Sequence, residues 1–161
     1  MYRLSVLFII FSWIAIGCSD DVKVSSDVEI KSISKDNQSC DFCQKKIKNA
    51  RYGGIITTST GEELQFRSIE CVAGYIVSKE LKSTDDVRVV NFIDAKTLLK
   101  VEDAIYLQSP NLGSPNGLDF AAIERKNVAM QEKIERVYPG QYLDWNEVMN
   151  RVIHSGYALN H

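Results

Sequence analysis

The order strand, strand, helix, strand occurs twice in the predicted secondary structure, and this repeat constrains the fold more than any other feature. The first copy is predicted as strands over residues 55–59 and 64–67 joined in a hairpin, a helix over 69–82, and a strand over 87–93. Ser68 directly precedes the apolar stripe of this helix and is a typical N-cap. A further short helix is predicted before the hairpin, over residues 40–49.

The second copy has the same order of elements. Its strands are predicted over residues 98–107, 118–123 and 141–144, its helix over 126–137, and a closing helix over 145–154. In the first of these helices we expect Val128, Ile134 and Val137 to face inward. Because one copy of about 50 residues buries little core alone, the two copies should pack together. The sequence therefore predicts an α+β fold of two ββαβ halves, residues 40–96 and 97–161.

The composition excludes several classes of protein. The chain of 161 residues is 45% hydrophobic and 25% charged, which is the balance of a protein that buries a core. Its 19 basic and 21 acidic residues give a net charge of -2, without the basic surplus that nucleic-acid binding requires. It has two histidines, no glycine-rich phosphate loop and no pattern typical of a catalytic triad. We therefore expect no nucleic-acid partner and no enzyme activity.

Residues 1–17 are predicted to be a lipoprotein signal peptide. Arg3 precedes an apolar stretch that is long enough for a signal sequence and too short for a membrane-spanning helix. The stretch ends at Ile16-Gly17-Cys18, which resembles the lipobox of bacterial lipoproteins, although Ala15 stands where leucine is most common. Acylation of Cys18 would anchor the mature chain in a membrane, and an ordinary secretory signal is the alternative. Residues 18–39 are polar and are expected to form a flexible tether.

Three cysteines remain once Cys18 carries a lipid. Cys40 and Cys43 form a Cys-x-x-Cys motif on one predicted turn, and Cys71 lies in the first turn of the predicted helix that begins after Ser68. An odd number of thiols in an oxidising compartment indicates an unpaired cysteine or a metal site. The dipole of the helix favours a thiolate at Cys71, whereas the neighbouring glutamate opposes it.

Four interpretations of these thiols are open. Cys40 and Cys43 act as the redox pair of a thiol-disulfide oxidoreductase, although the motif does not follow a central strand. They form a stapling disulfide, with Cys71 as a buried residue in a structural lipoprotein. All three bind zinc, which requires His154 or His161 from the C-terminal region as a fourth ligand. Finally, all three bind Cu(I), a soft ion that accepts two or three sulfur ligands and needs no fourth.

Several motifs, taken in order, resemble those of the NosL family, lipoproteins that act as copper-delivery accessory proteins for nitrous oxide reductase. The similar segments are the lipobox, the Cys-x-x-Cys motif, Phe66-Arg67-Ser68-Ile69-Glu70-Cys71, residues 90–95, Ser114-Pro115-Asn116-Gly117, and residues 118–123 and 140–145. The resemblance runs through nearly the whole mature chain. It implies a fold of two ββαβ halves, Cu(I) as the bound ion, and nitrous oxide reductase or its copper-loading machinery as the partner.

Two positions depart from the family's pattern. The family has methionine two residues after the second cysteine and in the Ser/Thr-Pro-Met-Gly loop, and here these positions hold Lys45 and Asn116. The thioethers that the family could offer to Cu(I) are therefore absent, while the cysteines are kept. Either the three cysteines bind copper alone, or another ligand replaces the methionines.

The sequence thus leads to one prediction of function. We expect a Cu(I)-binding protein of the cell envelope, anchored by lipid on the periplasmic side or on the outer surface of the outer membrane. Cys40, Cys43 and Cys71 are its predicted metal ligands. It delivers copper to a client, which the resemblance identifies with the assembly of nitrous oxide reductase.

Overall fold

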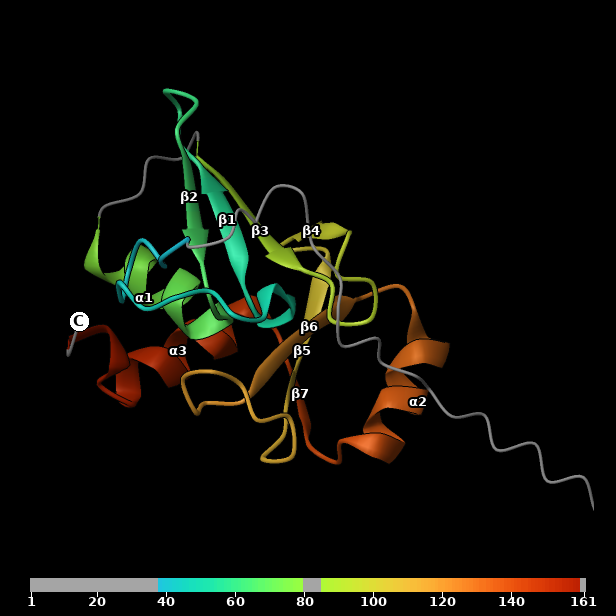
Figure 1. Ribbon diagram of the computed structural model, residues 1–161. Coiled ribbons are helices and arrows are strands. Elements are labelled where there is room, and N and C mark those ends of the chain that lie inside the picture. The colour runs from blue at the N-terminus through green and yellow to red at the C-terminus, as the bar shows by residue number, and fades with distance from the viewer. Residues whose placement is uncertain (1–37, 80–84, 160–161) are drawn as a thin grey trace, which may run out of the picture.

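A computed structural model describes residues 38–79 and 85–159, and these form two antiparallel sheets with three α-helices (Figure 1). The signal peptide, Cys18 and the tether up to residue 37 lie outside the described residues. The first sheet has the strand order β2 (Glu63–Phe66), β1 (Gly54–Thr57), β3 (Asp86–Val90), β4 (Leu98–Lys100). The second has the order β6 (Phe120–Glu124), β5 (Ala104–Gln108), β7 (Gln141–Leu143).

The helices complete two units of the predicted kind. They are α1 (Ile69–Ser78), α2 (Val128–Val137) and α3 (Trp145–His154), with short 3-10 turns η1 (Ala50–Tyr52) and η2 (Tyr157–Leu159). The chain order is therefore β1-β2-α1-β3 and then β5-β6-α2-β7. The predicted α+β fold of two ββαβ halves is confirmed.

Local capping explains where two of the helices begin. The side chain of Ser68 accepts a hydrogen bond from the backbone N–H of Cys71 and starts α1, as the sequence predicts. Asp144 and Glu147 form a capping box at the start of α3, in which each side chain bonds the other residue's backbone N–H. The helix predicted over 145–154 is observed with the same bounds.

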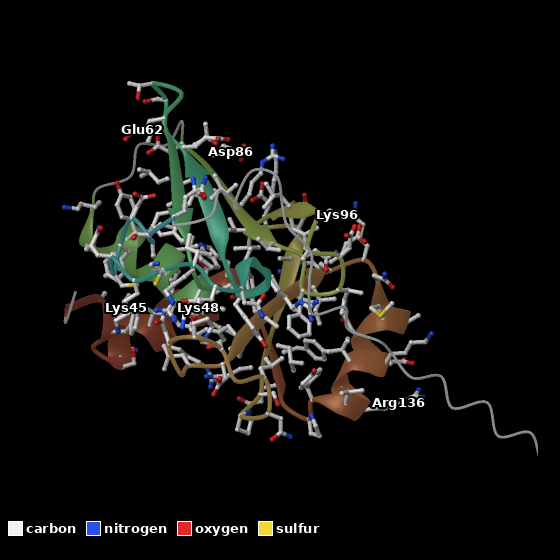
Figure 2. The ribbon with its side chains drawn as sticks, in the orientation of Figure 1. Lys45, Lys48, Glu62, Asp86, Lys96 and Arg136 are labelled. Atoms are coloured by element: carbon white, nitrogen blue, oxygen red, sulfur yellow. The ribbon has the colours of Figure 1, made fainter. Side chains whose placement is uncertain are left out.

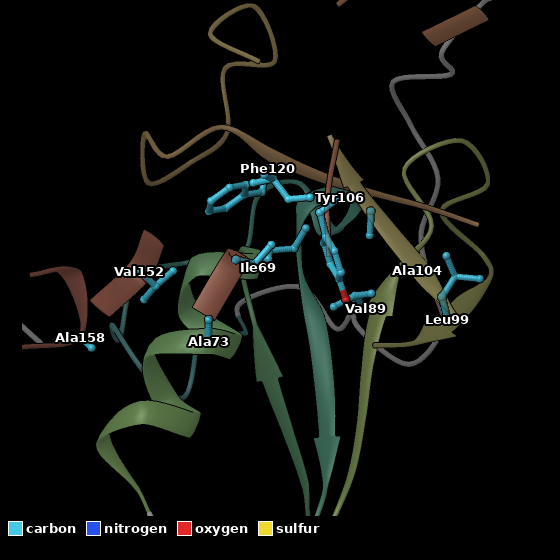
Figure 3. Packing of buried hydrophobic residues seen from close by; sticks show 12 residues of the cluster. Ile69, Ala73, Val89, Leu99, Ala104, Tyr106, Phe120, Val152 and Ala158 are labelled. Carbon is cyan, nitrogen blue, oxygen red and sulfur yellow. The ribbon is translucent and has the colours of Figure 1, made fainter. Parts of the chain in front are cut away.

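The largest apolar cluster joins the two halves. It combines Ile69 and Ala73 of α1 with Val89 of β3, and with Tyr106 and Phe120 of the second sheet (Figure 3). Val148 and Val152 of α3 close this cluster on its other side. The outer helix α2 contributes Ile134 to a separate cluster with Leu107 and Ile123. The halves therefore share a core, which fixes α1, α3 and η2 relative to one another.

The structure corrects three expectations about single elements. The segment 98–107 is two strands in different sheets, because the polar pair Glu102-Asp103 makes a turn in which the Asp103 N–H bonds the Lys100 carbonyl at 3.0 Å. Val128 and Val137 are 59% and 49% exposed, and of the valine-isoleucine set only Ile134 is buried. Residues 40–49 form a turn and an extended loop in place of a helix. Within the described residues, no helix is long and apolar enough to cross a membrane.

Candidate metal centre

The Cys40–Cys43 motif lies in a tight loop that backbone hydrogen bonds close at both ends. The Cys40 N–H bonds the Lys45 carbonyl, and the Gln44 N–H bonds the Cys40 carbonyl, both at 2.9 Å. Gln44 has a φ of 60°, the left-handed conformation that allows the chain to reverse here. The loop is fixed in position by its local backbone bonds, and it does not require a disulfide to hold its shape.

The same loop is attached to strand β2. The Asp41 N–H bonds the Gln65 carbonyl at 2.9 Å, and an Asp41 carboxylate oxygen accepts the Gln65 N–H at 2.5 Å. On the other side, the ring of Phe42 packs on α1, where a Cβ at position 74 would lie 2.7 Å from it. Gly74 therefore permits the close approach of the loop to the helix that carries Cys71.

These contacts bring three sulfur atoms together from two separate segments of the chain. The Sγ atoms of Cys40, Cys43 and Cys71 all lie within 4.8 Å of one another, and Cys43 and Cys71 are 3.6 Å apart. All three are free thiols. Cys40 and Cys71 are fully buried, whereas Cys43 is partly exposed. The arrangement offers three soft ligands to one ion, with one of them reachable from solvent.

The two buried thiols Cys40 and Cys71 shift each other's pKa in opposite directions. The hydrogen bond from Cys71, with smaller contributions from the backbone N–H groups of Cys43, Arg67 and Phe42, lowers the pKa of Cys40 to about 5 against the opposing effect of burial. The hydrogen bond to Cys40, together with burial, raises the pKa of Cys71. The expected thiolate at Cys71 is therefore wrong, because the buried Cys71 thiol is the proton donor that stabilises Cys40. Of the two buried thiols, Cys40 is therefore the one that loses its proton more readily.

Two residues that sequence reasoning did not assign to the site contact Cys71. The amide nitrogen of Asn116 lies 3.0 Å from the Cys71 sulfur and 2.5 Å from the hydroxyl of Ser68. The Tyr157 hydroxyl lies 3.3 Å from the same sulfur. Burial and the hydrogen bond with Cys71 raise the pKa of Tyr157, so this phenol stays protonated. Asn116 and Tyr157 are neutral groups that surround Cys71 from the second half of the chain.

A buried carboxyl group holds the Asn116 loop against α1. Glu70 is fully buried, and its Oε1 accepts hydrogen bonds from the Ser114 hydroxyl at 2.9 Å and from the Leu118 N–H at 3.1 Å. Burial raises the pKa of Glu70, and the hydrogen bonds only partly oppose this. Its second oxygen is buried with no hydrogen-bond partner among the described residues. Glu70, the residue before Cys71, thus joins the two halves next to the metal centre.

Of the two candidate histidines, His154 lies outside the cluster. His154 is exposed on α3, where its Nδ1 lies 2.7 Å from the Asn150 carbonyl, and His161 lies outside the described residues. Within the described chain, no histidine or carboxylate joins the three cysteines in a possible metal-binding group. The histidine that the zinc interpretation requires from residue 154 is therefore not at the centre.

The contact between Asn116 and Cys71 leads to a testable prediction. Replacing Asn116 with alanine removes a hydrogen-bond donor to a metal-ligand sulfur, and such outer-shell changes lower metal affinity by about 10–100-fold. We expect Asn116→Ala to weaken Cu(I) binding by at least about tenfold in a competition titration. Asn111→Ala is the matched control, because Asn111 is exposed on the same loop. Equal affinities of the two variants would contradict this role for Asn116.

Comparison with known proteins provides a structural relative. No protein-family model and no curated protein matches the sequence. The crystal structure of the copper chaperone NosL from Shewanella denitrificans matches with a TM-score of 0.56, covering 76% of this chain and 96% of that chain at 15% identity. A likeness at this level of identity shows a common fold. The resemblance that the motifs indicated is thus confirmed in three dimensions: this chain has the fold of a NosL copper chaperone.

Proposed function

We propose that this protein binds one Cu(I) ion through Cys40, Cys43 and Cys71 and passes it to a client protein. The observation that carries the proposal is the convergence of these three sulfurs within 4.8 Å in a fold shared with a copper chaperone. Cu(I) is a soft ion, and thiolates are its preferred protein ligands. The proposed role is that of a carrier without catalytic activity.

The set of ligands favours copper over zinc. A structural zinc site takes four ligands in tetrahedral geometry, usually cysteines and histidines. Here three sulfurs are surrounded by neutral hydrogen-bonding groups of Asn116 and Tyr157, which are not typical zinc ligands. Cu(I) is satisfied by the three sulfurs alone.

Delivery requires that a receiving protein can insert its own ligand before the donor releases the ion. Cys43 is the partly exposed member of the cluster, while Cys40 and Cys71 are buried. An incoming ligand would therefore displace Cys43 first, and the ion would leave through that side.

The proposal also names a client protein and a membrane anchor. The motif resemblance and the NosL fold support nitrous oxide reductase, or the machinery that loads it with copper, as the receiving partner. Acylation at Cys18 would hold the protein in the cell envelope, where such a client is assembled. In cells that lack this chain, we expect nitrous oxide reductase with reduced copper content, and normal copper content would argue for another client.

The binding claim is tested by anaerobic titration with Cu(I) against a competing chelator. We expect one tightly held ion per chain, and excess Zn(II) should not displace it. Weak or non-stoichiometric binding would overturn the proposal.

One observation favours a second function, thiol-disulfide exchange by Cys40 and Cys43. A thiol with a pKa of about 5 is typical of a redox-active cysteine. Against this, Cys40 is completely buried, so a disulfide substrate reaches only Cys43. Reduction of insulin by the protein in the presence of dithiothreitol separates the two functions, since only an oxidoreductase accelerates it.

A further inference from the structure

We infer that the surface around Cys43 is a positively charged docking face that selects anionic copper acceptors, such as a protein whose metal site is surrounded by carboxylates. This inference rests on the proposed copper-binding function and adds the chemical class of the partner. It is carried by two lysines, Lys45 and Lys48, which we call the basic rim.

The backbone fixes the basic rim next to the cysteines. The carbonyl of Lys45 accepts the N–H of Cys40 at 2.9 Å, and Ser39 and Lys46 form a β-bridge at the base of the same loop. Lys45 therefore lies directly beside the metal-binding loop, and its side chain is exposed. Lys48 is also exposed, three residues further along the chain. A partner that approaches Cys43 meets both side chains.

The lysines of the basic rim are not paired with acidic side chains in the part of the chain that the structure describes. Neither Lys45 nor Lys48 forms an ion pair with a described carboxylate, unlike Arg88, which pairs with Asp86. Asp41 is in the same loop and is exposed, and one of its carboxylate oxygens accepts the Gln65 N–H, so it directs one oxygen to β2 and not to the lysines.

The chain as a whole has a net charge of -2, so the basic rim reflects how the charged residues are distributed over the surface and not an excess of basic residues. Acidic residues collect at the far end of the first sheet, where Glu62 and Asp86 are labelled in Figure 2. The same figure shows Lys45 and Lys48 at the opposite end, beside α1. The two lysines of the basic rim therefore lie well away from Glu62 and Asp86.

The positive charge of the basic rim should affect the rate at which copper is transferred to an acceptor. Three thiolates around one Cu(I) leave two negative charges, which by themselves would repel an anionic acceptor. The two lysines offset this repulsion and attract an acceptor of negative charge. Charged surfaces of this kind change association rates by about 10–1000-fold, and salt screens the effect over about 8 Å at physiological ionic strength.

The test measures the rate at which the Cu(I)-loaded protein gives its ion to two small acceptors. One is a disulfonated phenanthroline chelator, which is anionic, and the other is its uncharged parent compound. The readout is the ratio of the two rates, because a change in the affinity of the site alters both rates together and leaves the ratio unchanged. The basic rim is reversed in the double variant Lys45→Glu/Lys48→Glu.

We expect the reversal to lower the anionic-to-neutral rate ratio by at least about tenfold at low salt, with the difference largely lost in about 1 M salt. The matched control is Lys96→Glu/Arg136→Glu, which changes the net charge equally at exposed positions away from the sulfur cluster (Figure 2). The control should keep the ratio of the unmodified protein.

Three outcomes would count against the inference. A ratio that is unchanged in the Lys45→Glu/Lys48→Glu variant overturns it, and so does an equal effect of the control variant. Both results leave the proposed copper binding intact, because the starting protein was loaded with Cu(I). If the unmodified protein cannot be loaded, the proposed function fails and this inference fails with it.

Discussion

Cys71→Ser is expected to lower the affinity for Cu(I) by more than about 100-fold. Loss of a residue that only supports a metal ligand lowers metal affinity by about 10–100-fold, and loss of a ligand itself should cost more. The Cys71 sulfur is the point at which the two segments of the centre meet, since it lies 3.6 Å from the Cys43 sulfur and bonds Cys40. Without it, the ion would have only the two sulfurs of the Cys-x-x-Cys loop. Serine is nearly the same size as cysteine, so the buried position stays filled. The measurement is an anaerobic competition titration with a chromophoric Cu(I) chelator.

His154→Ala is the control for this experiment. His154 is exposed and its ring contacts the Asn150 carbonyl, so the change should leave Cu(I) affinity unaltered. If Cys71→Ser bound Cu(I) as tightly as the unmodified protein, the ion would be held by the Cys-x-x-Cys loop alone. That result would reduce the proposed centre to a two-sulfur site.

The second large effect is expected on folding. Glu70→Ala removes the acceptor of two hydrogen bonds, from the buried Ser114 hydroxyl and the partly buried Leu118 N–H, and leaves both donors without this partner. Each such loss costs about 1–3 kcal/mol, so we expect a decrease of about 2–6 kcal/mol in the free energy of unfolding. This is a large share of the roughly 5–15 kcal/mol that stabilises a typical domain. Urea denaturation followed by circular dichroism measures it.

Glu63→Ala is the matched control, because Glu63 is exposed on β2 and its replacement should change the stability by less than about 0.5 kcal/mol. A similar stability for the Glu70→Ala and Glu63→Ala variants would contradict the role of Glu70 as the link between the halves.

Glu70 also predicts how stability depends on pH. Burial raises its pKa in the folded protein, so the folded state holds the proton more tightly than the unfolded chain does. The contribution of this group is complete below about pH 4.3, the pKa of glutamate in the unfolded chain, and declines as pH rises toward the folded value. Glu70→Gln keeps the side chain uncharged and of similar shape. Its stability relative to the unmodified protein should therefore increase from pH 4 to pH 8, and a constant difference would contradict the prediction.

The parts of the fold that the sequence predicts well are those set by local interactions. Ser68 before an apolar stripe locates the start of α1, because a cap acts on the first turn of its own helix. The closing helix predicted over 145–154 is likewise α3, although its cap Asp144 was predicted as the end of the preceding strand. The division of residues 98–107 between two sheets escaped prediction, since it depends on which strand each piece pairs with. The exposure of Val128 and Val137 likewise depends on how α2 lies over its sheet.

In the candidate metal centre, too, local features were predicted from the sequence and contacts between distant segments were not. Cysteine spacing and the cap of α1 identified the three thiols, which the structure brings together. Asn116 and Tyr157 were missed as neighbours of Cys71 because they are 45 and 86 residues away from it in the chain. Asn116 reaches Cys71 through a loop whose path depends on left-handed residues at Gly113, Gly117 and Asp119. The motif resemblance marked this loop, but only the packing of the two halves reveals its contact with the sulfur.

The account depends above all on one ion being held by sulfur from Cys40, Cys43 and Cys71 together. X-ray absorption spectroscopy at the copper edge of the Cu(I)-loaded protein tests this directly, because it counts the ligand atoms and identifies their element. We predict three sulfur neighbours and no nitrogen or oxygen at bonding distance. A centre with two sulfurs, or one completed by nitrogen or oxygen, would contradict it.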